Sequence, residues 1–289
     1  MFLFTTVADY RTQRRDWQGK TLALVPTMGA LHQGHQALIR EARALADVVV
    51  VSIFVNPLQF GPQEDLAAYP RPKDQDLAIC EQLGVDAVFY PSPLEMYPDG
   101  PDHVTRVVPP ASMTEGFCGA FRPGHFEGVA TVVLKLFSIT QPDFAVFGEK
   151  DAQQLAIIQK MVHDLNLPVR IVPHPTLRNE RGLALSSRNQ YLKTPQEQEA
   201  ALCLSQILSG VQQALTEATA PLPAEKILER LQAAVLAPWQ AGPVSVRVQY
   251  LAAVDPVTFQ PVSQLQPGVR VLIAAYVNQV RLIDNCLLT

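Results

Sequence analysis

The residue types best suited to chemistry gather in two segments about 150 residues apart. The first, PTMGALHQGH, covers residues 26–35 and ends in a His-x-Gly-His pattern. The second, LSSRN, covers residues 185–189 and joins a serine pair to Arg188. Imidazole and guanidinium groups can stabilise the negative charge that develops when a phosphate is attacked. Together the two segments predict a nucleotide-binding site that activates a substrate by transferring AMP to it.

His32 and His35 are three residues apart, so at the start of a helix their side chains face the same side. Gly34 allows a nucleotide to approach the backbone closely, and a helix N-terminus offers N–H groups and a favourable dipole to phosphate. The alternative is a turn whose histidines only cap the helix or fill space. The pair Met28-Gly29 just upstream, together with the second segment, favours the functional interpretation.

The second segment offers hydroxyl groups and a permanent cation. Ser186 and Ser187 could bind phosphate, and Arg188 would counter the charge of a pentacoordinate α-phosphate. The alternative is a simple helix cap followed by a surface arginine, because serines are common at helix starts.

A third charged group, Gly148–Asp151, lies at a predicted strand-to-helix corner. Lys150 is a candidate phosphate clamp. Asp151 could bind ribose, hold Lys150 or cap the following helix, and the sequence leaves these roles open.

Gln59 and Gln154 are the candidate residues for an acidic substrate. A side-chain amide both donates and accepts hydrogen bonds, so two of them could bind a hydroxy acid through its carboxylate and hydroxyl groups. Asn56 is a candidate of the same kind. The alternative for each is a solvated or backbone-bonded amide.

Three further residues are weaker candidates. His125, after the loop that contains Arg122, is expected to start a helix as a structural residue. Asp74 and Asp76 are expected on a solvated helix face, where one of them could touch magnesium. Magnesium in such sites is held largely by substrate phosphates and water, so no protein ligand is assigned to it.

The elements that position these residues alternate between strand and helix. Apolar runs and helical periodicity predict strands at 21–25, 48–55, 87–90, 144–147 and 169–172, with helices at 34–46, 73–83, 126–139 and 152–165. This alternation predicts an α/β fold with a doubly wound, parallel, Rossmann-like sheet. Ligands bind beyond the carboxyl ends of the strands in such sheets, and the candidate residues follow three of the predicted strands.

After about residue 178 the pattern changes to that of a smaller α+β domain, so we expect domains at 1–177 and 178–289. Helices are predicted at 195–216 and 224–236, and strands at 244–252, 271–277 and 279–284. The last two strands suggest a hairpin around Asn278.

Composition excludes several classes of protein. The net charge is −4 and Lys and Arg form no cluster, which argues against a nucleic-acid partner. No apolar run is long enough to span a membrane. The N-terminal residues lack the features of a signal peptide, and the four cysteines have no disulfide or zinc-site spacing, so we expect reduced thiols in a cytoplasmic protein.

Six segments resemble the pantothenate synthetase (pantoate–β-alanine ligase) family of the HxGH nucleotidyltransferases. They are PTMGALHQGH (26–35), SIFVNPLQFGPQEDLAAYPR (52–71), FRPGHFEGVATVV (121–133), FGEKDAQQL (147–155), GLALSSRNQYL (182–192) and RLIDN (281–285). The resemblance implies an AMP-forming ligase in which ATP and pantoate give pantoyl adenylate and pyrophosphate, with Mg²⁺. The amine of β-alanine then displaces AMP to give pantothenate. It also implies a cytoplasmic homodimer whose second domain acts as a lid.

The resemblance further implies roles for individual residues. His35 would be the proton donor, with His32, Lys150 and Arg188 beside it in catalysis. Gln59 would serve pantoate and β-alanine, and Gln154 pantoate. The implied ATP contacts are Met28, Gly29, Ala30, Leu31, His32, Gln33, Gly34, His35, Gly148, Glu149, Lys150, Asp151, Leu177, Leu185, Ser186, Ser187 and Arg188.

The chain departs from the family pattern at a few positions. Ala152 replaces a usual tyrosine, and Leu185 replaces a usual methionine of similar volume. Asn179 and Arg181 replace usual acidic residues, which alters the charge near the expected hinge. Some relatives carry a fused cytidylate kinase domain, but this chain has no P-loop pattern, so we expect ligase activity alone.

Two other functions stay open. A nucleotidylyltransferase with a phosphate acceptor would share the His-x-Gly-His pattern, but it would need more cations than the two neutral glutamines supply. A catalytically silent nucleotide-binding protein would not need His35, Lys150 and Arg188 intact.

Overall fold

The computed structural model describes residues 1–62 and 64–289, which form two compact units. Unit 1 comprises residues 1–149 and 154–175, and unit 2 comprises residues 150–153 and 176–289. Gln63, within the segment 52–71 quoted above, lies outside the described residues. Each unit has its own hydrophobic core.

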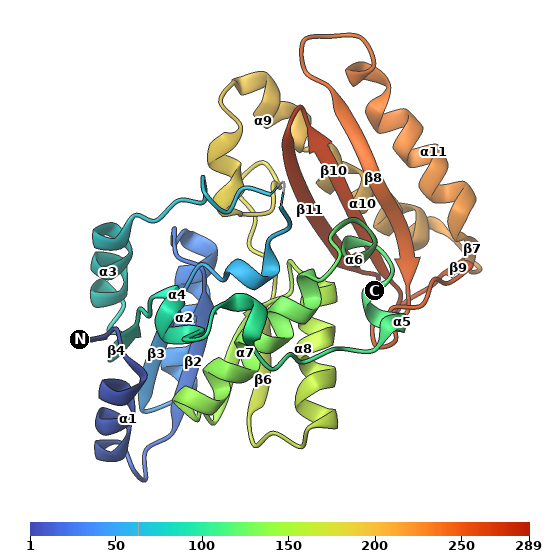
Figure 1. The fold of residues 1–289 in the computed structure, drawn as a ribbon. Coiled ribbons are helices and arrows are strands. Elements are labelled where there is room, and N and C mark those ends of the chain that lie inside the picture. The colour runs from blue at the N-terminus through green and yellow to red at the C-terminus, as the bar shows by residue number, and fades with distance from the viewer. Residues whose placement is uncertain (63) are drawn as a thin grey trace. The chain divides into compact units, whose positions relative to one another are not determined.

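Unit 1 is built on a six-stranded parallel sheet with the strand order β1-β4-β3-β2-β5-β6 (Figure 1). The strands are β1 (Phe2–Phe4), β2 (Leu22–Thr27), β3 (Val48–Ile53), β4 (Ala87–Phe89), β5 (Phe144–Gly148) and β6 (Arg170–His174). The long helices are α1 (Val7–Asp16), α2 (Gln33–Leu45), α3 (Lys73–Gln82), α7 (His125–Thr140) and α8 (Ala152–Asp164). Short helical turns are η1 (Pro57–Gln59), α4 (Pro93–Met96), η2 (Pro101–His103), α5 (Ala111–Thr114) and α6 (Cys118–Phe121). The predicted parallel α/β class is confirmed.

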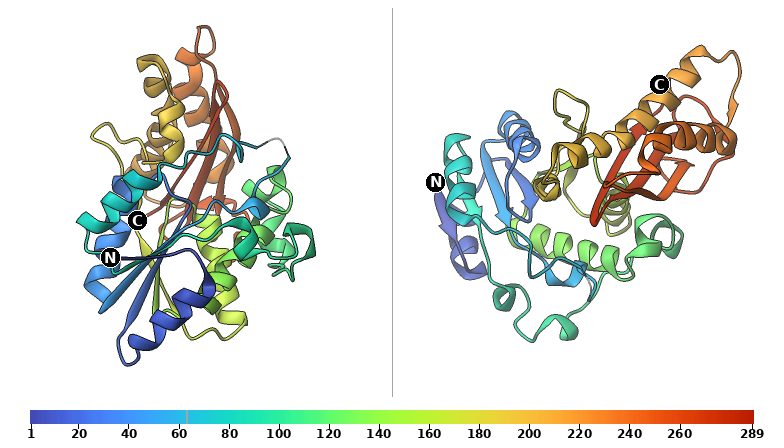
Figure 2. Two further views of the ribbon diagram at one scale, coloured as in Figure 1. Left: turned by 60° about the vertical axis from the view of Figure 1, so that its left-hand side comes forward. Right: turned by 90° about the horizontal axis from the view of Figure 1, so that it is seen from above.

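Both faces of this sheet are buried, which explains its unbroken apolar strands. Alternate residues of a strand point to opposite faces. Leu22 and Leu24 belong to the core cluster that contains α7 residues, whereas Ala23 and Val25 belong to the cluster that contains α2 residues. Seen from above in Figure 2, α2 and α7 cover opposite sides of the strands. All six residues of β3 are buried in consequence.

The strand order places the candidate residues at one edge of the sheet. From β2 the chain runs to β3 and β4 on one side, and β5 then pairs with the other side of β2. The carboxyl ends of neighbouring parallel strands meet at such a switch point, which is where open α/β sheets bind ligands. Residues 28–35 follow β2, Asn56 and Gln59 follow β3, and residues 149–151 follow β5.

Unit 2 packs three helices on antiparallel strands. Its three-stranded sheet has the order β11-β10-β8, and β7 pairs with β9. The elements are η3 (Ser187–Tyr191), α9 (Pro195–Ala201), α10 (Cys203–Glu217), β7 (Leu222–Pro223), α11 (Ala224–Leu236), η4 (Ala237–Trp239), β8 (Val246–Val254), β9 (Gln264–Leu265), β10 (Arg270–Val277) and β11 (Val280–Leu287). The predicted α+β character is confirmed, and Asn278 takes a left-handed φ of 51° in the β10–β11 hairpin.

Several boundaries differ from the prediction. The sequence pattern did not reveal β1 and α1. Strand β2 continues through Pro26, which pairs in register with Ser52 of β3. Pairing of β2 with β5 covers only Ala23 and Leu24, so the missing N–H of Pro26 interrupts no bond on that side. The predicted helix 195–216 is two helices, because the N–H of Leu202 bonds three residues back to Glu199 and tightens the turn.

The described part of the chain bears on membrane insertion and on the state of the cysteines. None of its helices combines the length and the apolar character needed to cross a membrane. The four cysteines are free thiols, as predicted. Burial raises the pKa of the Cys80 thiol to about 12, so this side chain behaves as a small apolar residue.

Helix α7 approaches η1 most closely at Gly128, and this contact generates a prediction. A Cβ atom at position 128 would lie 2.2 Å from the carbonyl oxygen of Leu58. We expect Gly128→Ala to lower the free energy of unfolding by about 3 kcal/mol, because backbone atoms must move to make room. Urea denaturation measures this loss. Gly242→Ala is the control, since nothing lies within 4 Å of its added methyl group; equal losses in the two variants would contradict the close contact.

Candidate functional site

The chain turns sharply after β2, and three hydrogen bonds to side chains hold the turn. The Thr27 hydroxyl donates to the carbonyl of Ser52 at 2.8 Å and accepts the N–H of Gly29 at 3.1 Å. Gly29 and Ala30 both have left-handed backbone, with φ of 82° and 51°. The Asp76 carboxylate accepts the N–H groups of Ala30 and Leu31 at 2.9 and 2.7 Å. The expectation that Asp76 lies on a solvated face is wrong, because it is only 1% exposed.

His32 and His35 form the cap of helix α2. The His32 Nδ1 accepts the N–H of Gly34 at 3.1 Å, and the His35 Nδ1 accepts the N–H of His32 at 3.3 Å. This reciprocal arrangement is a capping box in which imidazoles replace the usual hydroxyl and carboxylate. The two ring centroids are 4.1 Å apart.

The capping box also determines where the imidazole protons lie. A neutral ring whose Nδ1 accepts a hydrogen bond carries its proton on Nε2. Both rings therefore present an Nε2–H donor, the group that a developing phosphate charge requires. The capping alternative and the functional interpretation are compatible, since each ring uses one nitrogen for the cap.

A cavity of about 180 Å³ in unit 1 is lined by residues at or after the carboxyl ends of β2, β3 and β5. Its polar lining includes His35, Asn56, Gln59 and Gln154. Its remaining lining residues are Pro26, Thr27, Met28, Phe54, Tyr69, Val129, Val132, Val133, Leu136 and Phe147. The two glutamines, which are 95 positions apart in the sequence, thus line one small cavity that has both polar and apolar lining residues.

Asn56 holds Gln59 at the edge of this cavity. The Asn56 Nδ2 donates to Gln59 Oε1 and to the carbonyl of Gly128, both at 3.1 Å. Its Oδ1 accepts the Tyr97 hydroxyl at 2.8 Å and the N–H of Leu58 at 3.3 Å. Both amide hydrogens and both oxygen lone pairs are therefore engaged within the protein. This arrangement favours a positioning role for Asn56 over direct binding in this conformation.

The backbone of Gln59 is held from the other side by two residues of the loop before α7. The Gln59 carbonyl accepts Arg122 Nη2 at 3.2 Å and contacts His125 Nδ1 at 2.8 Å. A carbonyl only accepts, so His125 is protonated on Nδ1, and its Nε2 accepts Arg122 Nη1 at 3.0 Å. Arg122 also pairs with both carboxylate oxygens of Glu64, at 2.7 and 2.5 Å. His125 is 4% exposed and starts α7, so the structural interpretation of this residue is confirmed.

Unit 2 carries the remaining candidates. The N–H of Leu185 donates to the carbonyl of Leu177 at 2.9 Å, which places these two candidates side by side. Ser186 caps η3 and accepts the N–H of Arg188 at 3.3 Å, as the capping alternative predicted. Ser187 and Arg188 are the first residues of η3 and are partly buried.

Two residues of the RLIDN segment (281–285) form hydrogen bonds with Lys150 and Arg178 in unit 2. The Asn285 side chain donates to the carbonyl of Lys150 at 3.0 Å. Asp284, which is 4% exposed, pairs with Arg178 through two hydrogen bonds of 2.6 and 2.9 Å. The sequence alone assigns no role to this segment. Its contacts show that it fixes the backbone of Lys150 and the loop that begins at Arg178.

The departures at positions 179 and 181 have partners of their own. The Asn179 side chain accepts the N–H groups of Arg181 and Leu183 at 3.0 and 2.9 Å, so it organises the loop as an acidic residue would. Arg181 forms an ion pair with Glu199, and both side chains are about half exposed. The altered charge is therefore neutralised locally.

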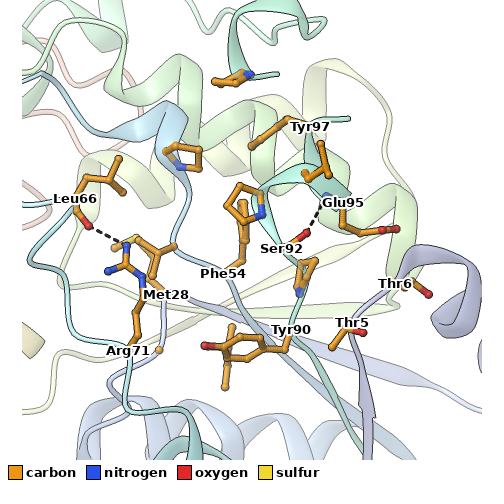
Figure 3. Close-up of a pocket in the computed structure, with 18 of the residues that line it drawn as sticks. Thr5, Thr6, Met28, Phe54, Leu66, Arg71, Tyr90, Ser92, Glu95 and Tyr97 are labelled. Carbon is orange, nitrogen blue, oxygen red and sulfur yellow. Dashed lines mark hydrogen bonds between the residues drawn. The ribbon is translucent and has the colours of Figure 1, made fainter. Parts of the chain in front are cut away.

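A larger cavity lies beside the one that the two glutamines line. It has a volume of about 830 Å³ and is lined mainly by apolar residues from the loops after β3 and β4 (Figure 3). Met28 lines both cavities, and Gly29 and Asp76 line the larger one. Its size alone does not make it the site, because the residues suited to chemistry line the smaller cavity.

Comparison with known proteins decides the family. A family model described as pantoate-beta-alanine ligase matches residues 2–287. The chain belongs to the pantoate-beta-alanine ligase family. A pantothenate synthetase from Thermus thermophilus is 42% identical, covers 99% of each chain and superposes with a TM-score of 0.90. A pantoate-beta-alanine ligase from Francisella tularensis, solved in complex with beta-gamma ATP and beta-alanine, is 36% identical with a TM-score of 0.80 and covers 99% of this chain and 97% of that one.

Curated relatives of this ligase family are longer than the chain. A bifunctional pantoate ligase/cytidylate kinase from Thermosynechococcus vestitus is 53% identical over 98% of this chain and 54% of its own length. A protein of the same name from Synechococcus sp. (strain JA-3-3Ab) is 51% identical over 98% of this chain and 52% of its own length. The chain thus spans about half the length of these relatives.

The contacts of Arg122 predict a loss of stability when they are removed, and the ion pair of Arg106 with Glu127 provides the control. Arg122→Ala removes a two-point ion pair whose side chains are 12% and 24% exposed. It also removes one hydrogen bond to the Gln59 carbonyl and one contact to His125 Nε2. We expect a loss of about 2 kcal/mol in the free energy of unfolding. Arg106→Ala removes a 3.2 Å ion pair with Glu127, between side chains that are 31% and 30% exposed, and an exposed hydrogen bond to the carbonyl of Pro101. It should cost less than about 1 kcal/mol. Equal losses in urea denaturation would contradict this ranking.

Proposed function

We propose that the chain catalyses the ATP-dependent condensation of (R)-pantoate with β-alanine to pantothenate. Pantoyl adenylate is the intermediate, and pyrophosphate and AMP are released. Family membership supports this activity, as does the likeness over nearly full length to solved members of the family. A carboxylate cannot react directly with an amine because oxide is a poor leaving group, whereas AMP is a good one.

The observation that carries the proposal is the cavity of about 180 Å³, which has both polar and apolar lining residues. Gln59 and Gln154 supply amides for the hydroxyl and carboxylate groups of a small hydroxy acid. Val129, Val133 and Leu136 supply an apolar wall, which suits the two methyl groups of pantoate. Specificity for such a substrate needs both kinds of contact in a space of this size.

In the first step, a carboxylate oxygen of pantoate attacks the α-phosphorus of ATP, and the bond from that phosphorus to the bridging oxygen of pyrophosphate breaks. The Nε2–H groups of His35 and His32 donate hydrogen bonds to the phosphate oxygens as their charge grows. The cations of Lys150 and Arg188 counter the same charge. No covalent bond to the protein is required, so positioning and electrostatics perform the catalysis.

The proposed nucleotide contacts are those expected from the sequence. They are residues 28–35, 148–151, Leu177 and residues 185–188. Residues 29–31 support this role through left-handed backbone that turns the chain into the capped start of α2. Leu177 and Leu185 support it as two apolar residues joined by a backbone hydrogen bond, since apolar side chains suit a purine ring.

In the second step, the neutral amine of β-alanine attacks the acyl carbon of pantoyl adenylate. The carbon–oxygen bond to AMP breaks, the amide bond forms, and the amine proton passes to solvent. Gln59 is the proposed shared contact for pantoate and β-alanine.

In the proposed reaction, Mg²⁺ binds to the protein together with ATP. The part of the chain that the structure describes contains no group of three or more His, Cys, Asp or Glu side chains suited to a metal ion. Both carboxylate oxygens of Asp76, the acidic residue nearest to the turn, accept backbone N–H groups. The residues therefore do not form a protein-held metal site. We assign Mg²⁺ to the phosphates of ATP and derive no step through it.

The main rival is transfer of a nucleotide to a phosphate acceptor. The described residues that line the cavity include no lysine or arginine, and an acceptor phosphate would need such a partner. Incubation with ATP and Mg²⁺ separates the possibilities. Pyrophosphate release that requires pantoate, with AMP release that also requires β-alanine, supports the ligase. Release with a mononucleotide such as nicotinamide mononucleotide supports the rival, and ATP binding without pyrophosphate release supports a silent binding protein.

His35→Ala should reduce pantoate-dependent pyrophosphate release about 10²–10³-fold, because one donor to the developing charge is lost. Single-turnover kinetics with saturating ATP measures this rate. His163→Ala is the matched control, since the His163 side chain is 84% exposed on α8. A wild-type rate in His35→Ala would remove the proposed role of this residue.

Gln154→Ala should raise the KM for pantoate by up to about tenfold while changing the KM for ATP much less, because one ligand hydrogen bond is worth about 1 kcal/mol. Steady-state kinetics with each substrate varied in turn gives both constants. Gln213→Ala on α10 is the control, because the Gln213 side chain is exposed and donates a hydrogen bond to Glu217 on the same helix. A parallel rise in both KM values would indicate a structural role for Gln154.

We further propose that the protein works in the cytoplasm and as a homodimer. The four free thiols support a reducing compartment. Light scattering after size-exclusion chromatography tests the dimer.

A further inference from the structure

Asp76 occupies an unusual place for a charged residue. It lies in the first turn of α3 and is 1% exposed. Its Oδ2 accepts the N–H of Ala30 at 2.9 Å, and its Oδ1 accepts the N–H of Leu31 at 2.7 Å. These contacts link residues 45 and 46 positions apart in the sequence. A buried carboxylate is costly unless hydrogen bonds compensate its charge, so the pair of N–H donors and the carboxylate depend on each other.

The turn that Asp76 holds adopts strained backbone. Ala30 has a φ of 51°, a conformation that residues with a side chain adopt rarely. Gly29, with a φ of 82°, packs directly against the carboxylate, because a Cβ at this position would lie 2.9 Å from Asp76 Oδ2 and 3.0 Å from Ile53 Cγ2. The carboxylate therefore helps to compensate the local cost of this strained turn.

This turn leads directly into the capping box. Leu31, whose N–H is bound by Asp76, is followed at once by His32, the N-cap of α2. The N–H of His32 in turn fixes the ring of His35 through Nδ1. A shift of the turn moves both rings, and a displacement of about 1 Å in an active site can cost about 10²-fold in rate.

We propose that Asp76 is a positioning residue for adenylate formation: it fixes the turn 29–31 and so aims the Nε2–H groups of His32 and His35. This inference rests on the proposed function and adds a residue to it. Asp76 lines the larger cavity and not the one with the two glutamines. Both of its carboxylate oxygens are bonded to the turn, so it acts through the turn and not by touching pantoate. Burial raises the pKa of Asp76, and the two backbone N–H bonds oppose that rise.

The variant Asp76→Asn tests the proposal, with Asp74→Asn as the matched control. Asparagine keeps the size of the side chain but turns an NH₂ group toward one of the two backbone N–H groups. Asp74 lies on the same helical turn and is exposed. We expect kcat for pantoate-dependent pyrophosphate release to fall about 10- to 100-fold in Asp76→Asn, with a smaller change in the KM for pantoate. Asp74→Asn should behave as wild type. The loss should persist in excess Mg²⁺, whereas a metal-binding role predicts recovery.

A double-mutant cycle measures the coupling of two substitutions in kcat, a quantity that general destabilisation of the protein does not change. Gly29→Ala places its methyl group against the carboxylate, so Gly29→Ala and Asp76→Asn should be strongly non-additive in kcat. Additive losses in kcat, or a wild-type kcat in Asp76→Asn, would overturn the positioning role.

Hydrogen exchange of the wild-type protein tests the same contacts without a variant. The amide protons of Ala30 and Leu31 should be protected, since both are bonded to Asp76. Rapid exchange at both amides would overturn the proposal even if Asp76→Asn failed to fold. The exchange result is independent of activity, so failure of the proposed reaction in the wild-type assay is distinguishable from failure of this inference.

Discussion

The parallel pairing of β2 with both β3 and β5 is the constraint on which unit 1 depends. Because the strands run in the same direction, their carboxyl ends meet at one edge, and the segments that follow them must share that edge. A polar turn follows β2, and the turn η1 follows β3. The cavity lined by His35, Gln59 and Gln154 is a consequence of this topology, because its lining residues follow the ends of these strands.

Saturated hydrogen bonding then converts this shared edge into a defined geometry. Asn56 uses all its donors and acceptors, and the carbonyl of Gln59 is held by Arg122 and His125. Partly satisfied polar groups at such depth would be costly, so the network resists rearrangement. The close approach of α7 at Gly128 adds a steric limit on the same turn. Rigid support of this kind is what a site that works by positioning requires.

The sequence predicted those features that depend on local pattern. Buried strands read as unbroken apolar runs, and the candidate residues followed the strands that the structure contains. The sequence did not predict features that depend on which distant residue arrives at a given point. Asp76 lies on a helix with no clear apolar stripe, so nothing local reveals that Ala30 and Leu31 meet it. The short strand β1 pairs at the edge of the sheet, where Phe2 stays half exposed, and three residues give too short a pattern to recognise.

The imidazole capping box has a consequence for any attempt to raise the heat tolerance of this chain. Serine or threonine followed three residues later by glutamate or glutamine is the usual capping box, and histidine is not a preferred residue at either position. A protein engineer guided only by helix statistics would therefore replace His32 and His35 first. Under the proposed function, such a change would exchange activity for stability within one turn of α2.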